Sequence, residues 1–335
     1  MRVNLTKAVR KKILQSDRVL FALLVGAVLS LLRVGRVIAA EDVTVQVSSM
    51  TLFGTLAVAG ATELSTKPVV LIIAGSGPTD RNGNSRMLRG DNNSLKMLAE
   101  SLEACGIASI RYDKRGVGES ALAVKNESEL TLDSFVDDAL AWAREIRQDR
   151  RFGKLFLLGH SEGALIAVSV AQKVDVAGLI AVASPGRPAD ELFLDQLKRQ
   201  LPEKIFVQAK NILWQIKHGG AVKRIPDSLF VFFRPTVQPF LRSLFRFDPP
   251  KEIGKLRVPI LLVGGTYDAQ VDPKDADILV RSNPKAKLVI IEGMNHILKE
   301  VSPKDQDQRN SYIDPSIPIS NRLVEEVCGF IQSSK

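Results

Sequence analysis

Histidine and cysteine are scarce in this chain, and their scarcity restricts the chemistry available to it. Its 335 residues include three histidines and two cysteines. Two cysteines cannot supply a cysteine-rich metal site or a disulfide framework. We expect Cys105 and Cys328 to be buried free thiols, with a single bridge between them as the alternative. Hydrophobic residues make up 45% of the chain and charged residues 25%, so it has enough apolar material for a folded core.

The positive charge is concentrated at the N-terminus. The first forty residues hold eight lysines or arginines and one aspartate, so they carry most of the formal net charge of +9. The rest of the chain is nearly neutral. A nucleic-acid-binding protein needs a basic surface on its folded domain, so this distribution argues against nucleic-acid partners.

The same N-terminal segment, residues 1–40, has the pattern of an export signal. A basic stretch ends at Arg18, an apolar run covers residues 19–32, and the small residues Ala39 and Ala40 follow. As a helix this run spans roughly 21 Å, less than the ~30 Å hydrocarbon core of a bilayer. We therefore expect a cleaved signal peptide, with an uncleaved membrane anchor as the alternative because Arg33 and Arg36 follow the run. Either one predicts a periplasmic or extracellular body.

Residues 41–335 have the pattern of a single α/β domain. Residues 43–60 alternate apolar and polar side chains, which predicts an antiparallel hairpin. Short apolar runs then alternate with helical segments, which predicts a mostly parallel central sheet flanked by helices. The helices that carry Cys105 and Cys328 would lie on the same face of this sheet. The predicted strands cover residues 69–74, 107–112, 155–158, 176–183, 259–263 and 288–291.

A long segment separates the predicted strands at 176–183 and 259–263. It is too long for one crossover connection, so we expect an inserted helical cap at about residues 187–250. Eight of the fourteen phenylalanines of the chain lie in this range. We expect most of them to form the core of the cap and the others to contact an acyl group.

The sequence Gly-His-Ser-Glu-Gly at residues 159–163 follows a predicted strand and opens an apolar helix. This context is that of a nucleophile elbow, in which a strained turn exposes a serine hydroxyl above the sheet. Ser161 is therefore the predicted nucleophile. The backbone N–H of Glu162 would stabilise the oxyanion.

A serine nucleophile needs a positioned base, and only His160, His218 and His296 are available. His160 adjoins the serine and is expected to pack or hydrogen-bond locally. His218 is expected at the end of a helix, although Lys-His-Gly-Gly imitates an oxyanion motif. His296 follows the last predicted strand, where the base of such a fold belongs, so it is the predicted base.

The third member of the triad is expected after the preceding strand. Asp268 lies there, while Asp272 before a proline resembles a helix cap and Asp275 lies in the first helical turn. Asp268 is therefore the predicted partner of the histidine. A second oxyanion donor is expected from the loop after the strand at 69–74, where we assign Ser76, with Gly77 as the alternative.

Three further segments, residues 74–83, 111–120 and 264–272, complete a resemblance to a known family. With the elbow, they resemble the α/β-hydrolase superfamily, and within it the bacterial serine aminopeptidase-like esterases, over about residues 43–333. The resemblance implies an α/β-hydrolase fold with a cap, carboxylesterase activity on a small-molecule ester, and no cofactor or metal. Asp80, Arg81 and Arg115 in these segments are expected to form structural hydrogen-bonded pairs at the mouth of the site.

We therefore expect a serine hydrolase that cleaves carboxylic esters through an acyl-enzyme. A serine aminopeptidase or an acyltransferase would use the same triad. A non-catalytic binding protein on this fold is the alternative of a different class. Membrane association would occur through the N-terminus.

Overall fold

The computed structural model describes residues 39–58, 66–302 and 304–334. The predicted export segment lies outside the described residues, except for Ala39 and Ala40. These two residues begin the first strand.

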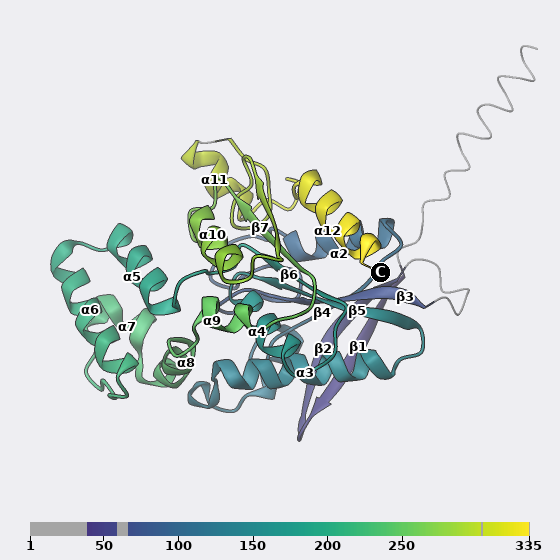
Figure 1. Ribbon diagram of the computed structural model, residues 1–335. Helices are drawn as coiled ribbons and strands as arrows, with labels where there is room; N and C mark the ends of the chain where they lie inside the picture. Colours follow the sequence, from purple (N-terminus) through teal and green to yellow (C-terminus); the bar gives the residue numbers. More distant parts are fainter. Residues whose placement is uncertain (1–38, 59–65, 303, 335) are drawn as a thin grey trace, which may run out of the picture. The chain divides into compact units, whose positions relative to one another are not determined.

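The molecule is organised around one eight-stranded sheet in the order β1-β2-β4-β3-β5-β6-β7-β8 (Figure 1). β1 pairs antiparallel with β2, and β2 pairs antiparallel with β4; all later pairs are parallel. The predicted hairpin and the predicted mostly parallel sheet are both confirmed. The strands are β1 (Ala39–Val47), β2 (Met50–Val58), β3 (Lys67–Ile73), β4 (Ala108–Tyr112), β5 (Phe152–His160), β6 (Gly178–Val182), β7 (Ile260–Gly265) and β8 (Lys287–Ile291).

The central strands are buried on both faces because helices cover each side. On one face, α2 (Ser94–Ala104) and α12 (Asn321–Ser333) contribute to one apolar core. On the other face, a second core includes side chains of the four helices α3 (Leu132–Gln148), α4 (Glu162–Ala171), α9 (Pro249–Gly254) and α10 (Pro273–Ser282). This two-sided burial is what continuous apolar strand sequences require.

Local capping sets where two of these helices begin. Thr131 forms a capping box with Ser134 at the start of α3. The Asp272 side chain accepts a hydrogen bond from the Lys274 N–H and caps α10, as predicted. Asp275 does lie in the first turn of α10, but its fully buried carboxylate also binds the backbone N–H groups of Gly186 and Arg187. It thereby fixes the chain as it leaves β6.

Four helices between β6 and β7 have an apolar core of their own. We call them the cap helices: α5 (Ala189–Gln200), α6 (Glu203–Lys217), α7 (Asp227–Phe233) and α8 (Gln238–Leu244), which lie at the left of Figure 1. Phe233 and Phe245 are buried in this core, whereas Phe230 is half exposed. His218 follows the end of α6, as predicted.

Several short elements complete the described chain. The helix α11 (Asp305–Ser311) was not predicted, and its polar sequence has no apolar stripe that would have indicated it. The short 3-10 turns are η1 (Gly118–Ala123), η2 (Glu127–Glu129) and η3 (Pro235–Val237).

The expectation of two free thiols is wrong, because Cys105 and Cys328 form a disulfide. Cys105 directly follows α2 and Cys328 lies in α12, and these helices pack on the same face of the sheet. Their Cα atoms are 6.3 Å apart, within the usual range for a bridge. The disulfide joins residues separated by 223 positions.

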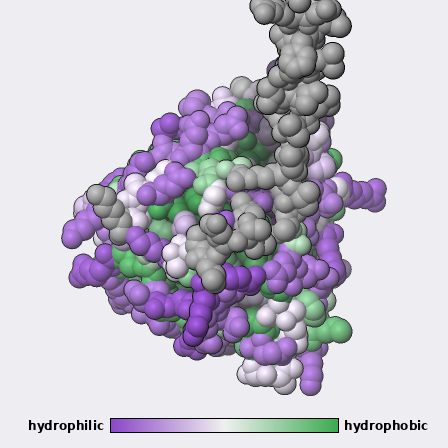
Figure 2. Space-filling view, turned by 90° about the vertical axis from the view of Figure 1, so that its right-hand side faces the viewer, coloured by the Kyte–Doolittle hydropathy of each residue, from purple (hydrophilic) through white to green (hydrophobic). Residues whose placement is uncertain are grey.

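The end of the molecule opposite the cap helices is largely hydrophilic, with small hydrophobic areas between polar side chains (Figure 2). Within the part of the chain that the structure describes, none of the helices has the length and apolar character needed to cross a bilayer.

The disulfide yields a first prediction. The double variant Cys105→Ala/Cys328→Ala should lose about 2–4 kcal/mol of unfolding free energy, because the unfolded chain is no longer closed into a long loop. Urea unfolding without reductant measures this difference. With reductant, the wild type should unfold close to the variant; equal unfolding midpoints without reductant would contradict a formed bridge.

Candidate active site

Ser161 occupies a sharp turn between β5 and α4. Its backbone has φ 54° and ψ −123°, outside the regions that residues with a Cβ normally adopt. A Cβ at Gly159 would overlap the Gly163 carbonyl oxygen, and one at Gly163 would overlap the Ile73 carbonyl oxygen. The turn therefore needs glycine on both sides of the serine, and it has the geometry that the elbow sequence predicted.

Asp268 and His296 are brought together at the ends of β7 and β8. His296 Nδ1 lies 2.8 Å from Asp268 Oδ2, and both side chains are almost completely buried. The other carboxylate oxygen accepts hydrogen bonds from the Gln270 and Val271 N–H groups. Burial disfavours the Asp268 carboxylate, but the charge and hydrogen bond of His296, with these N–H groups, hold its pKa below the ordinary value.

This hydrogen bond fixes which imidazole nitrogen is free. Nδ1 donates to the carboxylate, so Nε2 is left to accept a proton. Asp272 and Asp275 bind elsewhere, as described above, so Asp268 is the carboxylate that pairs with His296. Ser161, Asp268 and His296 follow β5, β7 and β8 at the carboxyl edge of the parallel sheet, where ligands bind in open α/β folds.

His160 has a larger role than local packing. Its Nε2 lies 2.7 Å from the His296 carbonyl oxygen, and the two imidazole rings are 4.9 Å apart. A carbonyl only accepts, so Nε2 carries a proton. Burial, with the nearby charge of His296, lowers the pKa of His160 to about 4. His160 thus supports the backbone of His296 across 136 residues of sequence.

The loop after β3 lies directly against Ser161. A Cβ at Gly75 would stand 3.2 Å from the Ser161 Cβ. Within the described chain, neither the Ser76 N–H nor the Glu162 N–H has a hydrogen-bond acceptor. Gly77 has a positive φ of 70° and serves the turn. The predicted oxyanion residues therefore border the predicted nucleophile.

A buried ion pair that the sequence did not indicate lies behind this loop. The Lys114 ammonium donates to the Gly75 carbonyl at 2.5 Å and lies 3.6 Å from a Glu162 carboxylate oxygen. The face of Phe135 packs against the same ammonium, 5.1 Å from the ring centroid, which favours its charged form. Burial lowers the pKa of Lys114 and raises that of Glu162, and the charge of each opposes the shift of the other.

Of the three charged residues expected to form structural pairs, Arg81 and Arg115 do so. Arg115 binds Asp138 through two hydrogen bonds, and Arg81 pairs with Asp113 and Glu119. The Asp80 carboxylate accepts from two backbone N–H groups of its own loop. These contacts hold the two loops that follow β3 and β4.

Two cavities meet at this site. The first, which we call the cap cavity, has a volume of about 190 Å³ and lies between Ser161 and the cap helices. Its walls are mainly apolar. They include Leu165, Leu192, Phe193, Phe240, Leu244 and Phe245.

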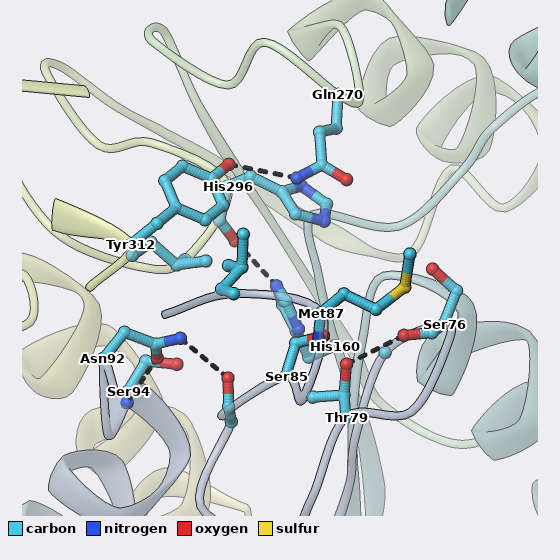
Figure 3. A pocket seen from close by; sticks show the side chains of 14 residues that line it. Ser76, Thr79, Ser85, Met87, Asn92, Ser94, His160, Gln270, His296 and Tyr312 are labelled. Carbon is cyan, nitrogen blue, oxygen red and sulfur yellow. Dashed lines mark hydrogen bonds between the residues drawn. The ribbon is translucent and has the colours of Figure 1, made fainter. Parts of the chain in front are cut away.

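The second cavity, which we call the loop cavity, has a volume of about 300 Å³ and is lined by His160 and His296 (Figure 3). Ser76 and Gln270 border both cavities. Among the described residues, no three His, Cys, Asp or Glu side chains are grouped as metal ligands.

A mostly parallel sheet with serine after β5, aspartate after β7 and histidine after β8 defines an α/β hydrolase. The family model described as "Serine aminopeptidase, S33" matches residues 92–300, more than half of the chain, and the chain belongs to this family. The resemblance predicted from the sequence motifs is thereby confirmed.

The curated relatives of this chain include an esterase and a peptidase. Esterase EstD of Thermotoga maritima is 28% identical over 270 residues, which are 78% of this chain and 61% of that protein, so this chain spans about three fifths of its length. Proline iminopeptidase of Saccharolobus solfataricus is 25% identical over 62% of this chain and 76% of its own length. The structure of Est1E from Butyrivibrio proteoclasticus with bound ferulic acid has a TM-score of 0.57 at 17% identity, covering 87% of this chain and 98% of that one, and supports the fold.

The position of His160 predicts a pH dependence of stability. Its pKa is about 4 in the folded state, against about 6.5 when unfolded, so the unfolded state binds the proton more readily. The neutral His160 ring therefore contributes to the free energy of unfolding fully above about pH 6.5. About 3 kcal/mol of this free energy is lost as the pH falls through the folded-state pKa of about 4. Urea unfolding of the wild type and of His160→Gln across this range isolates the effect. Parallel pH profiles of the two proteins would contradict it.

Proposed function

We propose that this protein is a serine hydrolase that cleaves carboxylic esters through an acyl-enzyme. The observation that carries the proposal is the arrangement at the carboxyl edge of the sheet: Ser161 on a strained elbow, the Asp268–His296 pair, and an apolar cavity that opens onto the serine. The membership in a hydrolase family supports the same chemistry.

In this mechanism, Ser161 Oγ attacks the ester carbonyl while His296 Nε2 takes the hydroxyl proton. Asp268 holds the imidazole in the required tautomer and stabilises its charged form. The carbonyl oxygen becomes an oxyanion that accepts hydrogen bonds from the Ser76 and Glu162 N–H groups. His296 then gives its proton to the departing alcohol. In the second half of the reaction, water loses a proton to His296 and attacks the acyl carbon, and this proton returns to Ser161 Oγ as the acid leaves.

Lys114 acts as a positioning residue for this oxyanion site. The Gly75 carbonyl that it binds belongs to the same peptide group as the Ser76 N–H, so the ammonium polarises this N–H and fixes its plane. Glu162, which supplies the other N–H, also holds the ammonium through its carboxylate. One buried pair thus connects both oxyanion donors.

The cap cavity favours an ester over a peptide with a free amino terminus. An aminopeptidase needs a carboxylate for the substrate ammonium, and Glu162, the carboxylate in this lining, is paired with Lys114. Two acids of the cap are also paired, Asp190 with Lys217 and Asp195 with Arg187. An apolar acyl group fits these surroundings better.

We also propose that the protein is exported, either periplasmic or extracellular, or anchored by its N-terminus. The basic stretch and apolar run of residues 1–40 support this location. The Cys105–Cys328 disulfide supports it independently, because such bridges persist in oxidising compartments.

The central test is Ser161→Ala. This variant should lose at least about 10³-fold in kcat with p-nitrophenyl butyrate, since the nucleophile is absent, and should no longer react with a fluorophosphonate probe. Ser169→Ala is the matched control, because its hydroxyl binds a carbonyl within the same helix. A folded Ser161→Ala protein with normal turnover would refute the mechanism.

A comparison of substrates distinguishes the alternative activities on the same triad. Faster cleavage of proline p-nitroanilide than of any ester would indicate an aminopeptidase. Faster transfer of the acyl group to an added alcohol than to water would indicate an acyltransferase.

The role of Lys114 has a separate test. Lys114→Met should reduce kcat about 10²-fold with little change in KM, because the contact acts on the oxyanion and not on the bound ester. This variant leaves the Glu162 carboxylate buried without its partner, so its folding is checked by thermal unfolding. The double variant Lys114→Met/Glu162→Gln removes both charges and should recover stability but not kcat. Recovery of the wild-type kcat would mean that the pair serves stability alone.

A further inference from the structure

The proposed nucleophile and the proposed base line different cavities. The cap cavity is lined by Ser161 but not by His296, and the loop cavity is lined by His296 but not by Ser161. Ser76, whose N–H has no hydrogen-bond acceptor in the described chain, borders both cavities. A substrate carbonyl bound at Ser76 would therefore have one cavity on each side.

The chemistry of acyl transfer assigns the two sides. The acyl group becomes bonded to the serine, so it must extend into the cavity that contains Ser161. The leaving oxygen receives its proton from the histidine, so the alcohol must depart on the side of His296. This argument rests on the proposed function, and it makes the loop cavity the site of the alcohol.

The lining of the loop cavity mixes polar and apolar side chains, and within the described residues it contains no Asp, Glu, Lys or Arg. Hydroxyl and amide groups lie on both walls seen in Figure 3, with Tyr312 and Gln270 on one and Ser85, Asn92 and Thr79 on the other. Met87, Leu88 and Ile297 add apolar surface. Such a mixture suits a molecule with several hydroxyl groups on a carbon skeleton.

Several of these groups have hydrogen-bonding capacity to spare. The Tyr312 oxygen accepts from Gln270 Nε2 at 3.0 Å, so its own proton is free to donate. The Ser85 oxygen accepts from the Met87 N–H, which likewise leaves its proton free. Gln270 Oε1 has no donor among the described residues and can accept.

We propose that the loop cavity binds the alcohol part of the substrate and that this alcohol is an uncharged polyol, a glycerol or sugar unit. The cavity volume of about 300 Å³ exceeds that of the cap cavity and is sufficient for either unit. A charged alcohol would be desolvated there without an ionic partner, which is costly.

Four butyrate esters with a common acyl group test this assignment: 1-monobutyrylglycerol, methyl 6-O-butyrylglucoside, propyl butyrate and butyrylcholine. We expect kcat/KM for at least one polyol ester to exceed that for propyl butyrate by 10-fold or more, and butyrylcholine to be the poorest substrate. The better of the two polyol esters distinguishes glycerol from sugar. Equal or better hydrolysis of propyl butyrate or butyrylcholine would overturn the assignment while leaving the esterase intact. Hydrolysis of no ester would overturn both.

The variant Tyr312→Phe tests whether the preference for a polyol ester arises in the loop cavity. Loss of one donor to a substrate hydroxyl should reduce the ratio of kcat/KM between the preferred polyol ester and propyl butyrate about 10-fold. Tyr112→Phe is the matched control, because Tyr112 lies buried on β4 in the sheet core and should keep the wild-type ratio. An equal loss on both substrates in Tyr312→Phe would mean a structural role for Tyr312, and the proposal would fail.

Discussion

The whole site depends on one backbone constraint, the positive φ of Ser161. Such a conformation costs about 1–3 kcal/mol and persists only where its surroundings enforce it. Here the Ser161 N–H binds the Val182 carbonyl at the end of β6, and α4 is buried almost along its full length. The glycines on either side admit the close approach of β3 and α4 to the turn. The position of the serine is therefore set by the packing of the sheet and not by the loop itself.

Charge burial around the elbow follows a consistent logic. A buried ion pair contributes little net stability, since desolvation offsets the attraction, but its geometry is sharply defined. The Lys114–Glu162 ion pair and the Asp268–His296 hydrogen bond each orient a group that borders the cavities. Lys114 binds the peptide group between Gly75 and Ser76, and Asp268 holds the His296 imidazole. His160 also orients a neighbouring group, but without a charge, because its buried neutral ring donates a hydrogen bond to the His296 carbonyl. The site is built from oriented dipoles supported by desolvated partners.

The sequence predicted what local patterns control. Apolar runs identified the strands, the glycine spacing at residues 159–163 identified the elbow, and chain order selected Asp268 and His296. Contacts between elements distant in sequence were less accessible, and even the Cys105–Cys328 bridge, whose helices were expected on one face of the sheet, was predicted only as the alternative. The Lys114 contact with Gly75, the His160 contact with His296 and the Cys105–Cys328 bridge each depend on how strands and helices are stacked. No spacing rule along one chain encodes that stacking. The sequence therefore predicted only a local contact for His160 and no contact for Lys114.

The two cavities have different structural origins, and this difference bears on how substrate preference could change. The cap helices build most of the cap cavity, the proposed acyl side, with α5 and α8 supplying Leu192 and Leu244. The loop between β3 and α2 and the residues after α11 build much of the loop cavity, the proposed alcohol side. An insertion such as the cap can vary without disturbing the sheet, whereas the loop after β3 also carries Ser76, the proposed oxyanion donor. Acyl preference is therefore free to change with the cap, while any change on the alcohol side must preserve the peptide that Lys114 holds.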